Sequence, residues 1–270
     1  MWFLAALLGW AVGGALNVLA DDLPPNQNGE RGAIRPPHCH HCGLWFGAAH
    51  WLALFHWMTG GRCERCGAKR RRRSLWVEVF SAVLFAGLWF WAQADVGRFY
   101  AAATVSSIFL LITIIDIEHR LILWRVVWVS AIVLLIIGLV SPERGWQKTL
   151  LGAVVGYGLV FGLFLLGQGY MWLVARWRGQ PLEEIAFGGG DVNLAGLIGL
   201  ALGWSGVLIA LFVGILAGGL FSLGYIVVQL ARGQYNPHSA IPYGPFLVLG
   251  AMFVYLFGRA VLAPWAAPTP

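Results

Sequence analysis

Long apolar runs separated by short polar segments dominate the chain. About 20 consecutive apolar residues are enough for a helix to cross the hydrocarbon core of a bilayer. The pattern predicts eight such helices, at residues 2–20, 75–94, 99–117, 121–140, 149–175, 188–204, 205–230 and 241–262. The sixth and seventh form one apolar stretch, in which only residues 203–206 indicate a turn.

Composition agrees with this pattern. Of the 270 residues, 59% are hydrophobic and 11% are charged, whereas a soluble domain carries about 25% charged residues. We therefore expect an all-α polytopic membrane protein with membrane lipid around it. The net charge of +6 does not favour nucleic acid as a partner, because the basic residues border the predicted helices. The first apolar run lacks Lys or Arg before its core, which favours a retained helix over the alternative of a signal peptide.

The distribution of Lys and Arg predicts the orientation. If the N-terminus lies outside, 14 of the 18 basic residues fall on the inside and 4 on the outside. The positive-inside rule then places both termini outside and the polar loop 21–74 in the cytoplasm. Nine of the 14 lie in this loop, so the prediction depends mainly on it. Asp116 and Asp191 both fall at the cytoplasmic ends of their spans.

The loop at residues 21–74 contains all four cysteines of the chain, Cys39, Cys42, Cys63 and Cys66. They form two Cys-X-X-Cys pairs separated by 20 residues, the spacing of a tetrahedral four-cysteine zinc site. Two disulfides are the alternative, which a reducing cytosol disfavours. A closed set of four thiolates predicts a structural zinc with a role in folding.

These observations give a domain organisation. Residues 1–20 form the first transmembrane helix, 21–74 a small zinc-binding cytoplasmic loop domain, 75–262 a seven-helix membrane catalytic domain and 263–270 a tail. Glycine pairs with three residues between them predict close helix packing. They are Gly9/Gly13, Gly152/Gly156, Gly158/Gly162, Gly199/Gly203 and Gly214/Gly218.

Two aspartates are the candidate catalytic residues. Asp116 closes the third apolar run, and Asp191 follows Gly188, Gly189 and Gly190 at the start of the sixth. A carboxylate in a membrane span costs about 2.5–3.5 kcal/mol even on lenient scales, so it usually marks a functional site. Two carboxylates about 3 Å apart share one proton and can together activate water against a peptide bond. The glycines would let a substrate or a helix approach Asp191 closely.

Other interpretations of these residues stay open. Asp191 could be a helix cap, and two membrane aspartates could serve a proton-coupled transporter. Glu118 and His119 could bind a metal. Glu78, one turn inside the second span, and Asn193, two residues after Asp191, are possible accessory residues.

The order of the motifs resembles the type IV prepilin peptidase family, which are GxGD-type membrane aspartyl proteases. The segments that carry the resemblance are residues 13–18 with Leu23-Pro24, the two cysteine pairs, and residues 76–78, 116–120, 187–194 and 241–246. The resemblance implies cleavage of the basic leader from type IV prepilins or pseudopilins at the cytoplasmic face of the bacterial inner membrane. Asp116 and Asp191 match the catalytic pair of the family.

The chain departs from the family pattern at three places. Asn193 stands where the family often has Lys, residues 121–124 lack a Pro, and Asp21-Asp22 stands where Arg often precedes Leu-Pro. The first two departures concern the charge around the aspartates and the entry to the fourth helix. Because of the third, Asp21-Asp22, the family's second activity, N-methylation with S-adenosylmethionine, is not assumed, and that cofactor is expected only if the activity is retained. The alternatives are a preflagellin-type protease, a proton-coupled transporter, and a zinc-binding assembly scaffold or inactive relative without protease activity. The oligomeric state is not predicted.

Overall fold

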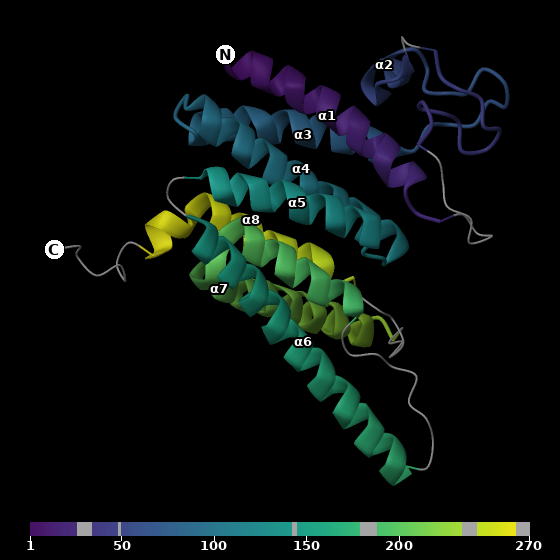
Figure 1. Ribbon diagram of the computed structural model, residues 1–270. Helices are drawn as coiled ribbons and strands as arrows, with labels where there is room; N and C mark the ends of the chain where they lie inside the picture. Colours follow the sequence, from purple (N-terminus) through teal and green to yellow (C-terminus); the bar gives the residue numbers. More distant parts are fainter. Residues whose placement is uncertain (26–33, 48–49, 142–144, 179–187, 234–241, 263–270) are drawn as a thin grey trace. The chain divides into compact units, whose positions relative to one another are not determined.

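The computed structural model describes residues 1–25, 34–47, 50–141, 145–178, 188–233 and 242–262, and every regular element in this part of the chain is a helix (Figure 1). The helices are α1 (Trp2–Asp22), α2 (Ala53–Met58), α3 (Arg72–Trp91), α4 (Val96–His119), α5 (Trp124–Val140), α6 (Gly145–Arg178), α7 (Gly189–Ala231) and α8 (Gly244–Leu262). The all-α prediction is confirmed. The predicted tail at 263–270 lies outside the described residues.

The helix α7 contains a reversal of the chain. Gly203 has φ 77° and ψ 176°, a conformation that only glycine adopts readily. Ala195 before it and Val207 after it both approach Gly156 of α6, so the two halves of α7 run back along each other. The sixth and seventh predicted spans therefore correspond to residues 189–202 and 204–231. The turn predicted at residues 203–206 begins at Gly203.

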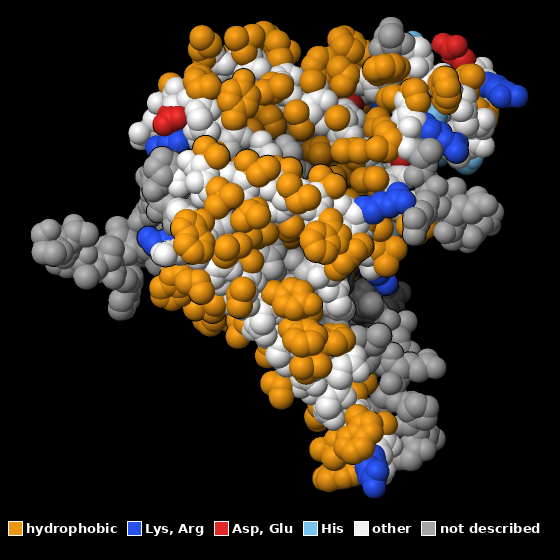
Figure 2. All heavy atoms as spheres, viewed as in Figure 1, with side chains coloured by type: hydrophobic (Ala, Val, Ile, Leu, Met, Phe, Trp, Pro, Cys, Tyr) orange, Lys and Arg blue, Asp and Glu red, His pale blue; other side chains and the backbone are white. Residues whose placement is uncertain are grey.

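The apolar lengths agree with a membrane protein. Five helices, α1, α3, α4, α6 and α7, are long and apolar enough to cross a membrane, and α5 and α8 are shorter apolar helices. Hydrophobic side chains cover much of the outward surface of the helices (Figure 2). In a soluble protein such a surface would be an aggregation hazard, whereas in lipid it is the expected exterior.

Two compact units divide the chain, Met1–Ile115 and Asp116–Pro270. In the first unit α1 packs on α3, with Gly9 against Phe85 and Gly13 against the Cα of Glu78, where added Cβ atoms would collide. Phe99 of α4 contacts the ring of Phe85 edge to face, with 6.1 Å between ring centroids. The Gly9/Gly13 prediction is confirmed.

In the second unit α7 packs on both α6 and α8. Gly152 and Gly199 bring the backbones of α6 and α7 together, and a Cβ on Gly214 would lie 2.9 Å from the carbonyl of Phe246 in α8. The Gly158/Gly162 prediction is wrong, since neither residue has another atom within 4 Å of its Cβ position. The physical reason for Gly158 is the helix face: it is exposed and lies two residues from Gly156, whose Cβ position meets Ala195 of α7, so it is on the other side of α6.

The end of α4 positions the first candidate aspartate. Arg120 has φ 53°, a left-handed conformation that stops the helix, and its N–H donates to the carbonyl of Asp116 at 2.8 Å. Asp116 therefore lies in the last turn of α4, and residues 120–123 lead to α5 without helical structure. This break lets the segment after Asp116 turn toward α7 of the same unit.

Candidate active site and metal centre

Asp116 and Asp191 lie in the same compact unit. Asp116 is buried, with 7% of its surface exposed; the backbone N–H of Gly244 interacts with its carboxyl group, and its Oδ2 has no well-aligned hydrogen bond from the described residues. Asp191 is half-buried at the start of α7. The fold brings the two predicted residues close enough for their carboxylates to interact electrostatically.

One carboxylate oxygen of Asp191 caps the start of α7. The N–H of Gly188 donates to Oδ2 of Asp191 at 3.3 Å, and the N–H of Asp191 donates to the carbonyl of Gly188 at 3.0 Å. Asp191 thus closes the first turn of α7, as an acidic residue at the third helical position often does. Its Oδ1 accepts no hydrogen bond from the described residues, so capping and chemistry are compatible in one side chain.

The three glycines before Asp191 have different surroundings. A Cβ on Gly190 would lie 3.0 Å from the Cβ of Ile122, in the segment that connects α4 and α5. Of the described residues, none has an atom within 4 Å of the Cβ position of Gly189, and only Asp191 and its own turn lie near that of Gly188. Close approach by the protein itself therefore explains Gly190, while Gly188 and Gly189 leave open surface beside Asp191. Phe187 lies outside the described residues.

The start of α8 borders the pair of aspartates, which sequence reasoning missed. A Cβ on Gly244 would lie 2.6 Å from Oδ2 of Asp116, so only glycine fits there. The preceding residue, Tyr243, interacts electrostatically with Asp191, and its hydroxyl donates to the carbonyl of Ile215 at 3.2 Å. The sequence feature that could have indicated this contact is the Gly244-Pro245 pair at the start of the last apolar run. Ile241 lies outside the described residues.

Glu78 belongs to the first unit and is fully buried. Its carboxylate accepts hydrogen bonds from Trp10 Nε1 of α1 at 3.0 Å and from the N–H groups of Ala53 at 2.6 Å and Leu54 at 3.1 Å. These three donors join α1 and the start of α2 to α3. Asn193 is half-buried in the second unit, in the first turns of α7. The accessory role of either residue in the active site stays a prediction.

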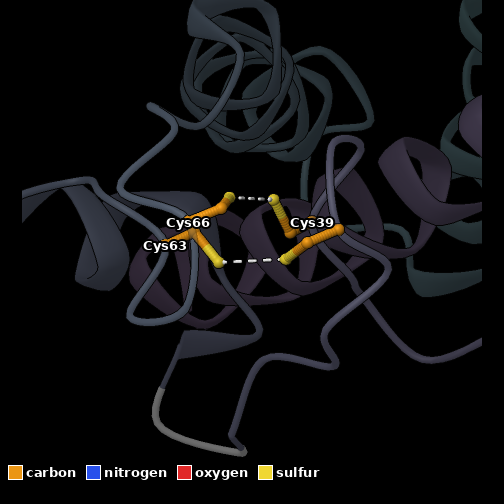
Figure 3. Close-up of side chains that lie close together, drawn as sticks. Cys39, Cys63 and Cys66 are labelled. Carbon is orange, nitrogen blue, oxygen red and sulfur yellow. Dashed lines mark hydrogen bonds between the residues drawn. The ribbon is translucent and has the colours of Figure 1, made fainter.

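The four cysteines converge on one point (Figure 3). Their sulfur atoms all lie within 4.8 Å of one another, with 3.6 Å between those of Cys39 and Cys66 and 3.6 Å between those of Cys42 and Cys63. None of the four is bonded to another in a disulfide. Four sulfurs about 2.3 Å from a central ion lie somewhat under 4 Å apart in a tetrahedron. The cluster therefore has the size and ligand set to hold a metal ion.

Two matching turns shape this cluster. The N–H of Gly43 donates to the carbonyl of Cys39 and that of Gly67 to the carbonyl of Cys63, both at 2.8 Å, and both glycines have φ 69°. Despite the N–H of Ala68, burial and hydrogen bonds with the other cysteines raise the pKa of the Cys66 thiol to about 12. The N–H of Cys66 instead points at the sulfur of Cys63 and, against the opposing effect of burial, lowers the pKa of the Cys63 thiol to about 6. A thiol of this kind is largely a thiolate at neutral pH, which is the form that binds metals.

A polar cavity of about 230 Å³ lies between the end of α1 and the loop, within the first unit. Its carboxylates already have partners. Asp21 accepts from Arg73 at 2.6 Å and lies 3.3 Å from His40, and Asp22 accepts from the N–H of Arg35 at 2.7 Å. These contacts tie the end of α1 to the loop within the first unit.

Comparison with known proteins identifies relatives for both units. The model of the bacterial peptidase A24 N-terminal domain matches residues 7–92, and that of the type IV leader peptidase family matches residues 103–223. The chain is 26% identical over 205 residues to a protein of Bacillus subtilis (strain 168) named prepilin leader peptidase/N-methyltransferase, covering 75% of this chain and 73% of the relative. Proteins of the same name from Aeromonas salmonicida and Pseudomonas aeruginosa are 24% identical over 249 residues and 26% identical over 276 residues.

These two alignments cover 90% and 94% of this chain, and 79% and 90% of the respective relatives. No solved structure matches the chain at a comparable level of significance. The apolar helices and the bacterial relatives indicate a multi-pass membrane protein. Taken together, the matches to both halves and the near full-length relatives show that the chain belongs to the type IV leader peptidase family.

Proposed function

We propose that this protein is a membrane aspartyl endopeptidase that removes the basic leader from type IV prepilins or pseudopilins. The observation that carries the proposal is the buried carboxylate of Asp116, whose Oδ2 has no well-aligned hydrogen bond from the described residues and which lies within the field of Asp191. A buried polar atom without a well-aligned hydrogen bond is rare in proteins and calls for an explanation. A water molecule and a scissile carbonyl are the partners that peptide hydrolysis would supply.

The pair would act as a shared acid and base. One carboxylate is ionised and takes a proton from water while the water oxygen bonds to the scissile carbonyl carbon. The other is protonated and gives its proton to the carbonyl oxygen. When the tetrahedral intermediate collapses, the C–N bond breaks and the leaving amine takes a proton from the pair. No covalent enzyme intermediate is needed, and the roles belong to the pair as a unit.

The surroundings support access by a peptide. Gly188 and Gly189 leave open surface beside Asp191, so an extended backbone could reach the carboxylate there. Gly244 and Gly190 instead hold α8 and the α4–α5 connection against the two aspartates. Such packing keeps catalytic groups in position, and a misplacement of about 1 Å can cost about 100-fold in rate.

The finer localisation is part of the proposal. The Lys and Arg distribution favours both termini outside, with the cysteine loop and the aspartate pair at the cytoplasmic face of the inner membrane. The proposed domain organisation is a first transmembrane helix at 1–20, a loop domain at 21–74 and a membrane catalytic domain at 75–262. Cleavage at this face would release the leader into the cytoplasm.

The metal of the cysteine cluster is proposed to be structural zinc. Four thiolates complete a tetrahedral set and leave no position for a substrate. Cys39, Cys42, Cys63 and Cys66 would hold the two turns of the loop together. Among the described residues, no set of side chains is assigned to S-adenosylmethionine. We therefore derive no methylation step.

The test is cleavage by the variants Asp116→Asn and Asp191→Asn, each alone, on a prepilin-like substrate with a basic leader and an apolar helix. The cleavage rate of each variant is expected to fall at least about 1,000-fold, because removing one member of a catalytic unit removes most of the effect of the whole unit. Glu118→Gln is the matched control, an exposed acid two residues after Asp116, and should cleave normally. Substantial cleavage by either aspartate variant would sink the two-carboxylate mechanism. Proton uptake into vesicles that depends on Asp191, without proteolysis, would favour a transporter.

A further inference from the structure

The short helix α2 of the loop domain lies beside the membrane-spanning helices of the first unit and not beyond their ends. Glu78, which bonds the first turn of α2, is six residues after the start of α3. At 1.5 Å per residue this is a depth of about 9 Å along α3. Leu52, just before α2, lies 2.6 Å from the Cβ position of Gly14, eight residues before the end of α1.

Another contact places α2 at a similar depth. The ring of Phe55 packs against the ring of Trp10 in the middle of α1, with 5.1 Å between centroids. The start of α2 is therefore bound to α1 and α3 through Leu52, Glu78 and Phe55. Figure 1 shows α2 alongside α1 within this unit. Lipid-facing side chains of α3, such as Trp76 and Phe80, are exposed at comparable depths, at 69% and 56%.

Four backbone groups at and before the start of α2 form hydrogen bonds with protein side chains. The N–H groups of Ala53 and Leu54 donate to Glu78, and Arg70 donates to the carbonyls of His50 at 2.9 Å and Trp51 at 3.0 Å. In hydrocarbon an unsatisfied backbone group costs several kcal/mol, so such pairing is what an inserted segment needs. In water the same groups would be solvated without a buried carboxylate.

The outer face of α2 is apolar. Ala53 and His56 are buried, whereas Phe55 is 46% exposed and Met58 is 75% exposed. Trp51, just before the helix, is 49% exposed. Hydrophobic side chains are visible over the region of α2 in Figure 2, with Lys and Arg side chains elsewhere on the loop domain. Basic residues at the start of α3, including Arg72, are exposed and suited to lipid phosphates.

We propose that α2 is an interfacial membrane helix, whose apolar face of Leu54, Phe55 and Met58 is covered by the acyl chains of the surrounding lipid. Interfacial helices bury their apolar faces about 5–10 Å into the boundary between headgroups and acyl chains, which agrees with the depth of Glu78. Lipid is the occupant because Phe55 packs on Trp10 of α1, a helix that is long and apolar enough to cross a membrane. The loop domain is then part cytosolic, at the cysteine turns, and part membrane-inserted, at α2. This proposal does not depend on the proposed catalytic activity.

The test measures the surroundings of Met58 in the full-length, zinc-loaded protein. p-Acetylphenylalanine replaces Met58 and carries a nitroxide through an oxime, which leaves the native cysteines untouched. The protein is placed in vesicles of phosphatidylethanolamine and phosphatidylglycerol, and collisions of the nitroxide with oxygen and with a water-soluble nickel chelate are compared. Oxygen should dominate several-fold at Met58. The same label at Glu64, an exposed residue of the second cysteine turn, should favour the nickel chelate.

Two results would overturn the proposal. A nickel chelate collision rate at Met58 as high as at Glu64 would place α2 in water. Low rates for both agents would show that protein covers this face. Leu54 is a second labelling site on the same face, for use if the label at Met58 lowers the zinc content. It should give the same preference for oxygen.

Discussion

Two buried carboxylates, one in each compact unit, have opposite surroundings. Glu78 is fully buried and accepts three hydrogen bonds, from Trp10, Ala53 and Leu54. Asp116 is almost as buried, yet its Oδ2 has no well-aligned hydrogen bond from the described residues. The two acids are buried alike and differ in their donors: three N–H groups for Glu78, and for Asp116 the backbone N–H of Gly244.

The difference has a physical reason. Burying a charge is unfavourable unless hydrogen bonds replace the lost water, and Glu78 has such bonds from two other helices. Its carboxylate therefore holds α1 and α2 to α3. Asp116 keeps an oxygen without a well-aligned hydrogen bond at a cost in stability, as expected of a group that must bind water or substrate. The variants below test this contrast, from the largest expected effect to the smallest.

Removal of the metal should give the largest difference in stability between the two units. Structural zinc contributes about 10–16 kcal/mol to the folding of small zinc domains, so chelation or Cys63→Ser should unfold the cysteine turns. Hydrogen exchange should become fast at residues 34–47 and 61–70. Residues 189–231 of the second unit should stay protected. An intact, protected loop without bound metal would show that the zinc interpretation is wrong.

Stability measurements on Glu78→Gln and Asp116→Asn should give opposite results. The amide at position 78 cannot replace a charged acceptor of three bonds, and the unfolding free energy should fall by about 3 kcal/mol. Asp116→Asn removes a poorly satisfied buried charge and should leave thermal stability unchanged or raise it. Tryptophan fluorescence during thermal unfolding in detergent measures both. Equal destabilisation by the two variants would remove the contrast between the carboxylates.

Gly244→Ala should damage catalysis without changing either aspartate. The new Cβ would lie 2.6 Å from Oδ2 of Asp116, so the carboxylate or the start of α8 must move. A shift of about 1 Å predicts a loss of about 100-fold in the cleavage rate. Gly219→Ala in α7 is the control, since its Cβ position has no atom within 4 Å. Normal cleavage by Gly244→Ala would mean that α8 does not hold Asp116 in place.

The smallest effect concerns the glycines before Asp191. An alanine at Gly190 meets Ile122 at 3.0 Å and should lower stability by about 1 kcal/mol, whereas an alanine at Gly189 meets open space. Gly189→Ala should be neutral or slightly stabilising, because alanine favours helix over glycine by about 1 kcal/mol. Unfolding midpoints of the two variants make the comparison. A lower unfolding midpoint for Gly189→Ala than for Gly190→Ala would show that the close contact with Ile122 is not at Gly190.

Some interpretations of the sequence concerned single residues whose neighbours could not be known. Glu78 is a possible accessory residue by its place in the second span, and its partners in α2 lie 24 and 25 residues earlier in the chain, where no local pattern indicates them. Gly158 and Gly162 have the same spacing as the packed pairs, yet no atom of the described residues lies near their Cβ positions, and Gly158 is on the opposite side of α6 from Gly156. Spacing describes one helix, and packing needs two.

The sequence by itself determined the eight apolar spans, the four-cysteine spacing and the two aspartates at the ends of their spans. These features depend on hydrophobic length and local chemistry, which are properties of the chain near each residue. Only the tertiary structure decided that Gly244 lies against Asp116, that Ile122 covers Gly190 and that Glu78 binds the start of α2. Such contacts join residues 24 or more positions apart, and no local pattern specifies which helix faces meet.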